Sequence, residues 1–480
     1  STGDLDVTAG AGNDVVWLEN GTAELTAKAS VDGGDGIDTL AIPGDEVFST
    51  GDYLKLTQYA TSFESILAVG AIGSAAKPVD ASEFPDVIAY TVTKGLNYFE
   101  EVASGTSFTN TLYQRDEEDY LGDYSLASAD NPTGATTFGA PLVSIETAGY
   151  KADEDLEDDD FAAEYGGNVS ITSATASSAL AGSPLAALGT SQTYDVFASN
   201  VQVVVAAIDL GKSGGFSQDV TLTGDMETVT VVLASARGTS TKAGGEYLAQ
   251  FSITTDPTED ADAMQGPKAI TVVGAGMVTI DASDDGDIAF DAAAENLTVI
   301  NLSGMTAFAN QNKTGDTVIA GDVTEGYLNL STSEVTTNDQ ISQTVKLGGA
   351  LDTVTTSSSS DYMDMIEGFA LEADLDTEDD DTDIDASASD VLVLNVSGSG
   401  VSDAVFVADD TEYTSIEAAL IAVAAGDDNN VVFHAEGNTY AFAGNGDGEL
   451  DEGDVVVGLV GTYDLDQLVN AVSAVDVSPS

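Results

Sequence analysis

Cysteine is absent from this chain of 480 residues, and basic residues are scarce. Without thiols there is no disulfide framework, no thiolate nucleophile and no cysteine-ligated metal site. The chain has 12 Lys and Arg against 83 Asp and Glu, which gives a formal net charge of −71. Because phosphate recognition needs clustered Lys and Arg, this deficit excludes a nucleic-acid partner and unassisted binding to an anionic membrane surface.

Long apolar runs are also missing. The longest stretches, such as Val201–Ile208, have the length of a strand, whereas a membrane-spanning helix needs about 18 or more apolar residues. The sequence therefore predicts no membrane span. No charged segment followed by an apolar segment comes after Ser1, so no signal peptide is visible. We expect a mature form or a fragment of a longer chain.

One hydrolase class is excluded by missing residues. His434 is the single histidine, which rules out HExxH zinc chemistry. His434 follows Val431–Phe433 in a predicted strand, where a structural role is expected. Among 83 carboxylates every useful spacing arises by chance, so carboxylate pairs are no evidence for glycoside hydrolysis. We expect that the protein is not an enzyme.

The residues that are abundant indicate short strands and tight turns. Hydrophobic residues make up 42% of the chain, and Gly (49) far outnumbers Pro (9). Val- and Thr-rich segments separated by Gly, Asp and Asn are typical of strands joined by turns. Examples are Val229–Ala234, Ala269–Ile280, Leu297–Leu302 and Tyr327–Leu330. Helical periodicity is found mainly in Ser415–Ala425 and Asp464–Val475. The prediction is an all-β fold with few short helices.

Shifts in composition suggest four segments. Asp153–Asp160 and Asp374–Asp385 are acidic runs, and Ser357–Ser360 is a serine run. Such acidic runs are expected to be solvated loops, with a low-affinity cation sink as the alternative. The predicted segments are 1–80 with calcium-binding turns, 81–165 as an acidic insertion, 166–345 as a solenoid-like or sandwich region, and 346–480 as a C-terminal cap with a secretion signal.

One motif carries specific chemistry. Gly33–Ala41 matches the nonapeptide GGxGxDxUx at every specified position, and Ala9–Trp17 differs only by Ala9. The glycines permit positive φ and let carbonyls point at an ion, and the aspartate adds a hard oxygen, as Ca²⁺ requires. The candidate calcium ligands are Gly10, Gly12, Asn13, Asp14, Gly34, Asp35, Gly36 and Asp38. The alternative is a Gly/Asp-rich turn that binds no ion.

The spacing of the two copies limits how they share a site. They begin at residues 9 and 33, more than two nonapeptides apart. The spacing predicts that they are not consecutive turns of an uninterrupted roll and that a strand pair, Val15–Ala27, loops out between them. Asp14 and Asp38 then face the same ion only if their turns are neighbours.

A second acidic constellation lies near the C-terminus. Oxygen-bearing side chains stand at positions 1, 3, 5, 7 and 10 of the segment 445–454, in the manner of an EF-type calcium loop. These residues are Asn445, Asp447, Glu449, Asp451 and Asp454. Position 12 is Val456 where the full EF loop has Glu. Calcium binding is predicted here, and an acidic hairpin turn is the alternative.

With these motifs the sequence resembles the RTX family of calcium-binding proteins that Gram-negative bacteria secrete. Beyond the nonapeptides, the likeness rests on Gly348–Val354, Asp364–Phe369, Asp390–Leu394, Gly437–Phe442 and Asp454–Leu459. The first is similar to a worn RTX turn, which makes Asp352 a further candidate ligand. The next two are similar to the passage after the repeats. The last two are similar to the closing hairpin near the uncleaved signal for type I secretion.

Among RTX proteins the composition looks most like that of S-layer proteins, and Phe63–Ile66 and Val143–Thr147 are similar to strand phrases in them. The resemblance implies RTX-like parallel β-roll or β-solenoid turns with inserted β-hairpins and β-sandwich-like segments. It also implies several Ca²⁺ ions and a secreted, cell-surface subunit that self-assembles into a two-dimensional lattice. A cell-surface polysaccharide is a further expected partner, through an N-terminal region missing from this chain.

Two other hypotheses remain open. The chain could be a calcium-rigidified module of a large RTX adhesin or surface filament. It could also be a haloarchaeal surface protein, since acidity fits molar salt and Asn296, Asn301 and Asn329 begin Asn-x-Ser/Thr sites. The haloarchaeal hypothesis leaves Gly33–Ala41 unexplained.

Overall fold

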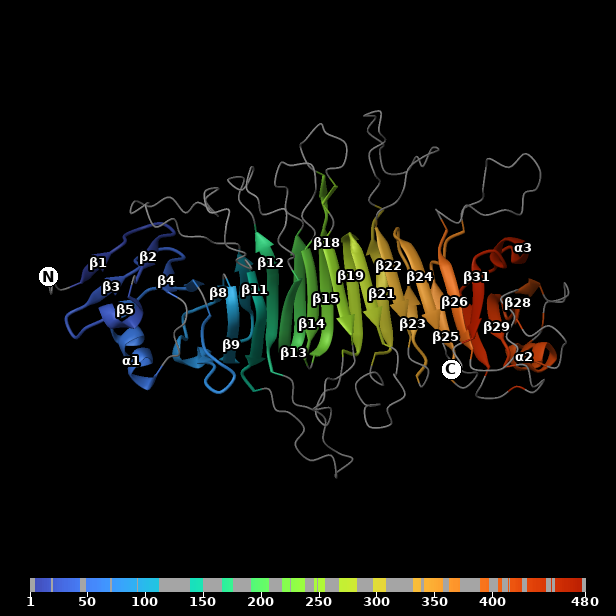
Figure 1. The fold of residues 1–480 in the computed structure, drawn as a ribbon, viewed down its shortest axis with the longest axis horizontal. Coiled ribbons are helices and arrows are strands. Elements are labelled where there is room, and N and C mark those ends of the chain that lie inside the picture. The colour runs from blue at the N-terminus through green and yellow to red at the C-terminus, as the bar shows by residue number, and fades with distance from the viewer. Residues whose placement is uncertain are drawn as a thin grey trace, which may run out of the picture. The chain divides into compact units, whose positions relative to one another are not determined.

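The computed structural model forms two compact units, Ser1–Phe251 and Ser252–Ser480 (Figure 1). It describes residues 5–18, 20–43, 49–69, 71–92, 94–111, 139–149, 166–175, 191–206, 218–224, 226–237, 246–247, 249–254, 267–282, 297–307, 331–337, 341–356, 362–371, 389–396, 405–407, 413, 415–424, 430–445, 450 and 454–476. The four predicted segments stay a prediction. The acidic and serine runs lie outside the described residues, as does Tyr327–Leu330.

The first unit begins with a small roll of three coils. The strands β1 (Asp6–Thr8), β3 (Ser30–Asp32) and β5 (Ala60–Thr61) pair in parallel and form the N-terminal sheet. A turn leads from each of them to β2 (Val15–Trp17), β4 (Thr39–Pro43) and β6 (Ser65–Val69), which also pair in parallel. The return paths contain η1 (Gly21–Glu24) and α1 (Thr50–Tyr59). Three turns are therefore stacked along one edge.

The helix α1, which the sequence analysis did not predict, begins with a capping box. The carboxylate of Asp52 accepts hydrogen bonds from the backbone N–H of Ser49 (3.0 Å), the hydroxyl of Ser49 (2.6 Å) and the hydroxyl of Thr22 (2.8 Å). Lys55 lies 3.6 Å from the same carboxylate and donates to the carbonyl of Thr22. These contacts attach α1 to η1. Hydrogen bonds from Ser49, above all, lower the pKa of Asp52 to about 2.

After this roll the chain alternates between two parallel sheets. Sheet I continues from β2, β4 and β6 through β8 (Ala89–Val92), β10 (Thr106–Thr111), β12 (Asn168–Thr175), the second half of β13 (Ser191–Ala206) and β15 (Met226–Ala234). Sheet II contains β7 (Val79–Asp80), β9 (Lys94–Val102), β11 (Gly139–Thr147), the first half of β13 and β14 (Gln218–Thr223). The helix η2 (Ala81–Glu83) follows β7. Such alternation between parallel sheets is that of a two-sheet β-solenoid.

In-register stacking of apolar side chains builds the core of this unit. The parallel pairing aligns one column of sheet I, and all of its members are buried: Leu40, Ile66, Tyr90, Phe108, Ile171, Val203 and Val231. Phe99 of sheet II packs against this column, with its ring 4.9 Å from Tyr90 and 5.1 Å from Phe108. The buried faces of the two sheets therefore meet. Two short strands, β16 (Ala236–Arg237) and β17 (Glu246–Tyr247), pair separately, and β18 (Ala249–Thr254) contains the boundary between the units.

The second unit repeats the alternation. Sheet III contains β19 (Ala269–Ala275), β21 (Val299–Met305), β23 (Thr344–Lys346), β25 (Asp364–Glu367) and β30 (Val455–Leu459). Sheet IV contains β20 (Met277–Asp281), β22 (Thr332–Thr336), β24 (Leu351–Thr356), β26 (Val391–Val396) and β31 (Val472–Asp476). Along β24 and β26, buried residues alternate with half-buried ones. One face of sheet IV is therefore a core face.

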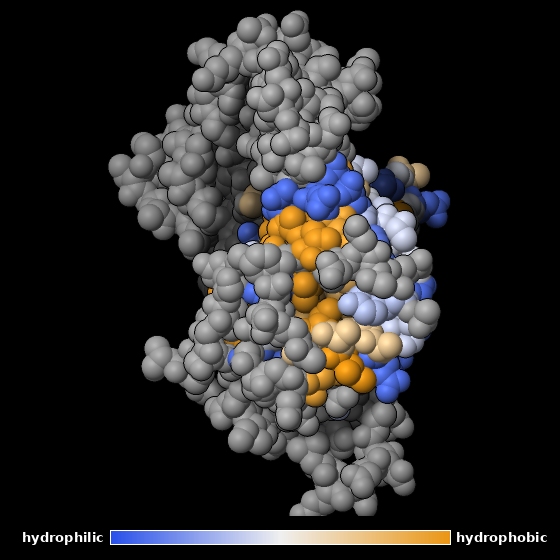
Figure 2. All heavy atoms as spheres, turned by 90° about the vertical axis from the view of Figure 1, so that its right-hand side faces the viewer, coloured by the Kyte–Doolittle hydropathy of each residue, from blue (hydrophilic) through white to orange (hydrophobic). Residues whose placement is uncertain are grey.

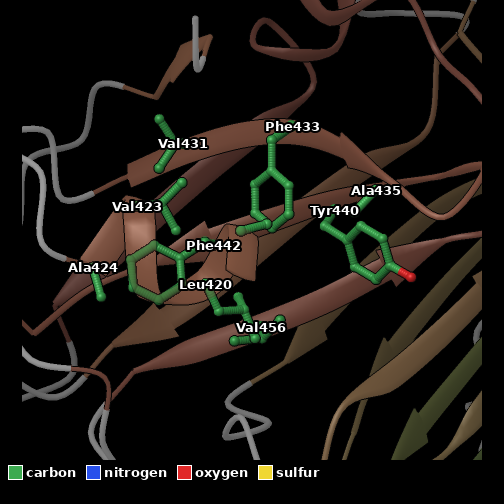
Figure 3. Packing of buried hydrophobic residues seen from close by; sticks show 10 residues of the cluster. Leu420, Val423, Ala424, Val431, Phe433, Ala435, Tyr440, Phe442 and Val456 are labelled. Atoms are coloured by element: carbon green, nitrogen blue, oxygen red, sulfur yellow. The ribbon is translucent and has the colours of Figure 1, made fainter. Parts of the chain in front are cut away.

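A hairpin and a helix extend sheet III near the C-terminus. The strands β28 (Asn430–Ala435) and β29 (Asn438–Ala443) form an antiparallel hairpin next to β30, and β27 (Phe406–Val407) pairs with β28. Leu420 and Val423 of α2 (Ile416–Ala424) pack on Phe433 and Phe442 of this hairpin (Figure 3). Figure 2 shows apolar side chains gathered on this end of the unit between polar ones.

The structure confirms the all-β prediction. It places strands over most of Val229–Ala234, Ala269–Ile280 and Leu297–Leu302, and a helix within Ser415–Ala425. The predicted helix Asp464–Val475 is wrong over its second half. Only Leu465–Leu468 (α3) is helical, because the residues from Val472 onward pair with β26 as β31. In the described part of the chain no helix has the length and apolarity needed to cross a membrane.

Candidate metal centre

The two motif copies lie directly one above the other. Val15 is opposite Thr39 between β2 and β4, and Ala11 forms a bridge with Asp35, so equivalent motif positions face each other. Of the predicted strand pair Val15–Ala27, Val15–Trp17 is strand β2, whereas Gly21–Glu24 is the helix η1 rather than a second strand. Only the rest of that segment makes the return path. The wide spacing in sequence therefore still gives neighbouring turns, because one coil of this roll is longer than two nonapeptides.

The glycines of the motif allow this close stacking. Gly34 and Gly36 have φ values of +101° and +152°, a region that glycine adopts without steric cost. A Cβ at Gly34 would lie 1.9 Å from the carbonyl oxygen of Gly10, and a Cβ at Gly36 would lie 1.9 Å from that of Gly12. The turns are thus in backbone contact, which only glycine at these positions permits.

Backbone and side-chain hydrogen bonds join the turns. Asp35 donates its backbone N–H to the carbonyl of Gly10 (2.7 Å), and its own carbonyl accepts from Gly12 (2.8 Å). The side-chain oxygen of Asn13 accepts the N–H of Ile37 (3.1 Å). The eight predicted ligand positions of the two motifs are therefore brought together in one stack.

The carboxylates form a column along the same edge. The N–H of Asp14 donates to Oδ1 of Asp38 (2.7 Å), and the N–H of Asp38 donates to Oε2 of Glu64 (2.9 Å). Glu64 precedes β6 at the end of the third turn, so each carboxylate binds the backbone of the coil before it. Sequence reasoning missed Glu64 because the third turn has no glycine motif. The segment Phe63–Ile66, which the sequence analysis interpreted only as a strand, contains Glu64 and was the one available indication of it.

Two oxygens of this column are buried without a hydrogen-bond partner. They are Oδ2 of Asp14 and Oδ2 of Asp38, and Asp38 as a whole is fully buried. The side chain of Asp38 closes over Gly33, where a Cβ would lie 3.0 Å from that Oδ2. Buried polar atoms without a partner are rare in native proteins, and an ion is one of the standard explanations.

Repulsion within the column gives a second reason to expect a cation. Neighbouring strands are ~4.8 Å apart, and two unit charges at that distance repel by roughly 3 kcal/mol at an effective dielectric constant of 20. The lysines with described ion pairs, Lys55 and Lys346, pair with Asp52 and Glu367 rather than with the column. A divalent cation would convert this repulsion into attraction.

The donors present fit Ca²⁺ in kind. Within the described residues no three acidic or histidine side chains converge into a ready-made metal cage. The turns instead offer a pair of carboxylate oxygens next to backbone carbonyls, and Ca²⁺ accepts such mixed oxygen sets. Asp14 and Asp38 are the residues that would hold the ion through their unpartnered oxygens, with Glu64 beside them.

Of the five predicted ligands in the C-terminal calcium loop, Asn445 and Asp454 are described. The N–H of Asn445 donates to Oδ1 of Asp454 (2.9 Å), and Asp454 is buried. Asp447, Glu449 and Asp451 lie outside the described residues. The carboxylate of Asp454 thus ties the two ends of the loop together, and its calcium binding stays a prediction.

Asp352 occupies a different environment from the N-terminal aspartates. It lies on β24 and is buried, and the preceding Gly348 and Gly349 lack the left-handed φ of Gly34 and Gly36. The resemblance of Gly348–Val354 to a worn RTX turn therefore does not extend to the backbone conformation. Oδ2 of Asp352 is nevertheless buried without a hydrogen-bond partner.

The same use of carboxylates recurs in the second unit. Oδ1 of Asp364 accepts the N–H of Gln343 (2.8 Å), and Oδ1 of Asp390 accepts the N–H of Asp352 (3.0 Å). Burial, and then the charge of Asp352, raise the pKa of Asp390 to about 7. Burial also raises the pKa of Asp352.

No family model and no curated protein matches this chain. The resemblance to RTX proteins therefore rests on the motifs, and the stacked turns are the structural counterpart of the motif that is matched at every specified position.

Proposed function

We propose that this protein is an extracellular structural subunit that Ca²⁺ orders and that self-assembles into a two-dimensional surface layer. The observation that carries the proposal is the pair of buried, unpartnered oxygens of Asp14 and Asp38 in two stacked glycine turns. Since each oxygen belongs to one copy of the nonapeptide, both copies contribute to a single cation site.

Calcium suits this site better than other biological cations. The available donors are carboxylate and carbonyl oxygens, which select hard ions. The chain contains no cysteine and one histidine, so soft or borderline metals lack their preferred ligands. Mg²⁺ demands octahedral geometry at short distances and retains its water, so we expect it to substitute poorly.

Assembly follows from the charge. Subunits that each carry −71 repel one another until cations bridge their carboxylates. With so few Lys and Arg, direct Lys–Glu pairs cannot supply many contacts between subunits. The interfaces of the proposed layer are therefore cation-mediated, and they join non-identical surfaces, because head-to-tail contacts that do not close can extend indefinitely.

Electron microscopy of the purified chain with millimolar Ca²⁺ and with chelator tests the proposal. Ordered sheets with Ca²⁺ and none with chelator support a layer protein. Circular dichroism on the same samples tests the ordering step, for which we expect more β structure and a higher melting temperature with Ca²⁺. Equal β content and equal melting temperature in both samples would contradict calcium-dependent folding.

The second candidate is a module of a large RTX adhesin or surface filament. It shares the calcium-ordered turns but needs no self-assembly, because its partner is a sugar, ice or another surface. Dispersed, well-folded monomers in Ca²⁺ would favour this candidate over the layer.

A further inference from the structure

The buried face of sheet IV contains a column of polar side chains. The register places Ser333 opposite Asp352, and Thr353 opposite Val391, so Asp390 comes next to Asp352 on the following coil. All three are at most 1% exposed. They lie among apolar neighbours, since Val354 and Leu392 on the same face are fully buried. Two carboxylates therefore meet in a core.

The hydrogen bonds of this column leave one oxygen over. Ser333 donates its hydroxyl to Oδ1 of Asp352 (2.6 Å), while Asp390 accepts the N–H of Asp352 at Oδ1 and the N–H of Ala370 at Oδ2 (2.7 Å). Oδ2 of Asp352 is buried and has no hydrogen-bond partner. The backbone of Gly348 is a further donor to Asp352. Every one of these donors is neutral, so among the described residues no cationic group balances the second negative charge.

Asp364 shows that a buried carboxylate of this unit can be satisfied by the chain alone. It is fully buried at the start of β25, as Asp390 is just before β26. Its Oδ1 accepts from Gln343, and its Oδ2 accepts the hydroxyl of Thr356 (2.9 Å). The unpartnered oxygen of Asp352 is thus a property of the Asp352–Asp390 pair rather than of buried aspartates in general.

We propose that Asp352 and Asp390 hold a second divalent cation, on the buried face of sheet IV and apart from the N-terminal turns. Oδ2 of Asp352 is the open ligand, and the carboxylate of Asp390 lies beside it on the next coil. The donors are oxygens, which suits Ca²⁺. For the identity of the ion this inference rests on the proposed function, but its residues belong to the other unit.

The competing arrangement is a proton shared by the two carboxylates. Desolvation raises the pKa of both groups, and together with the charge of Asp352 it raises the pKa of Asp390 to about 7. A shared proton neutralises one of the two carboxylate charges, whereas a divalent cation balances both. The number of bound metal ions per chain therefore distinguishes the two arrangements.

Calcium titration of the chelator-treated full chain is the first test. We expect Asp352→Asn and Asp390→Asn each to lose one equivalent of bound Ca²⁺ relative to the unmodified chain. Asp364→Asn is the matched control, and it should lose none. An unchanged Ca²⁺ equivalence in Asp390→Asn, together with a higher melting temperature in chelator, would overturn the cation and indicate the shared proton.

Terbium luminescence gives a second readout that does not depend on changing the ligands. The ring of Tyr463 packs edge-on against Phe369, with the centroids 6.1 Å apart, and the next residue, Ala370, donates its N–H to Asp390, so this phenol lies near the pair. Tyr463→Phe should keep the number of bound Tb³⁺ ions and lower the tyrosine-sensitised emission. Unchanged emission would place the ion elsewhere.

A separate signal reports the N-terminal turn site independently of the Asp352–Asp390 pair. Trp17 is the single tryptophan and lies on β2 beside the N-terminal turns. Tryptophan-sensitised Tb³⁺ emission therefore reports the turn site. We expect it to be abolished by Asp38→Asn and unaffected by Asp390→Asn. Loss of this signal in Asp390→Asn would contradict two independent sites.

Discussion

The N-terminal turns and the buried face of sheet IV use aspartate in the same way but surround it differently. In both regions a carboxylate accepts a backbone N–H of the preceding coil, as Asp38 does from Asp14 and Asp390 does from Asp352. The turns add glycines in left-handed conformations and nearby carbonyls. The sheet adds only a neighbouring carboxylate, a serine and apolar side chains. The shared hydrogen bond is thus structural, and the surroundings decide which aspartates are left with a free oxygen.

This difference explains why a motif marks one region and not the other. The tight turn requires glycine at fixed positions, because a Cβ would collide with the coil before it. The pair in sheet IV requires only that two coils align, which sets no fixed short spacing between Asp352 and Asp390 in the sequence. A local pattern can therefore indicate the first region only.

The largest effect that we expect comes from Gly34→Ala. The new Cβ would lie 1.9 Å from the carbonyl oxygen of Gly10 in a backbone of positive φ, so the turns must separate. We expect the turn stack to lose about 4 kcal/mol or more of stability, measured as the urea midpoint of Trp17 fluorescence. Gly10→Ala is the control, since its φ is also positive but no atom lies within 4 Å of its Cβ. It should lose only about 1–2 kcal/mol. Equal losses from both changes would contradict the stacking.

Asp38→Asn should have the next largest effect, and only when Ca²⁺ is present. A ligand at one hundred times its dissociation constant stabilises the folded state by about 2.7 kcal/mol. We expect the variant to lose most of the Ca²⁺-dependent rise in the melting temperature of the Trp17 signal. Asp86→Asn removes the same charge at an exposed position and should retain that rise. If both variants lost it equally, a diffuse ion atmosphere would replace the site.

Glu64→Gln tests how much the third carboxylate of the column contributes to Ca²⁺ binding at the turns. The amide oxygen can still accept the N–H of Asp38, so the hydrogen bond at 2.9 Å should survive while the charge is lost. We expect Ca²⁺ affinity at the turns to fall less than in Asp38→Asn, because Glu64 lies beside the two unpartnered oxygens. Calorimetric titration of both variants measures the order, and a larger loss in Glu64→Gln would make Glu64 the main ligand.

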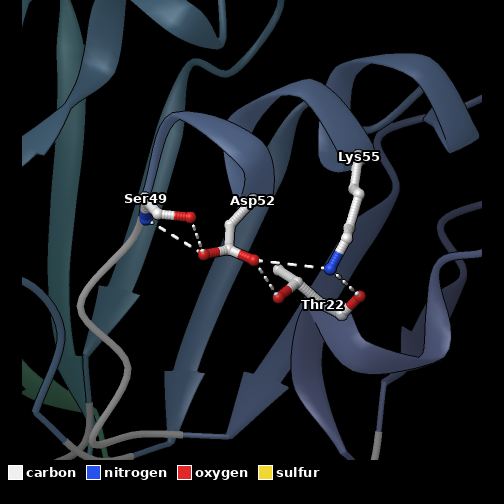
Figure 4. Close-up of polar contacts among 4 residues, drawn as sticks. All are labelled: Thr22, Ser49, Asp52 and Lys55. Atoms are coloured by element: carbon white, nitrogen blue, oxygen red, sulfur yellow. Dashed lines mark hydrogen bonds and ion pairs between the residues drawn. The ribbon is translucent and has the colours of Figure 1, made fainter.

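The smallest effect concerns the capping box of α1 (Figure 4). Asp52→Asn should cost about 1 kcal/mol at neutral pH, as the loss of a capping interaction usually does. Because the pKa of Asp52 falls from 3.8 in the unfolded chain to about 2 in the folded one, its contribution is present above pH 4. It is lost as the pH falls toward 2. The difference between the two proteins in urea midpoints should therefore shrink over that interval, and a constant difference would contradict the charge-based cap.

The sequence predicted the solenoid class and the N-terminal turns, but it misjudged how they connect. Glycine spacing and the position of the aspartate within each nonapeptide are local properties, so Gly33–Ala41 could be recognised directly. Coil length is not local. The return paths contain η1 and α1, which pack under the roll and lengthen each coil. The spacing of the two motif copies in the sequence therefore suggested separated turns. Glu64 was missed for the same reason, since only stacking brings it to Asp38.

By itself the sequence determined that the protein is acidic, free of cysteine and built of short strands joined by glycine turns, because composition and local periodicity control these properties. Only the tertiary structure decided which carboxylates meet. In a parallel solenoid, residues far apart in the chain become neighbours through register. Register is fixed by the burial of apolar columns such as Ile66, Tyr90 and Phe108. That packing places Asp14 beside Asp38 and Asp352 beside Asp390, and it withdraws their oxygens from water.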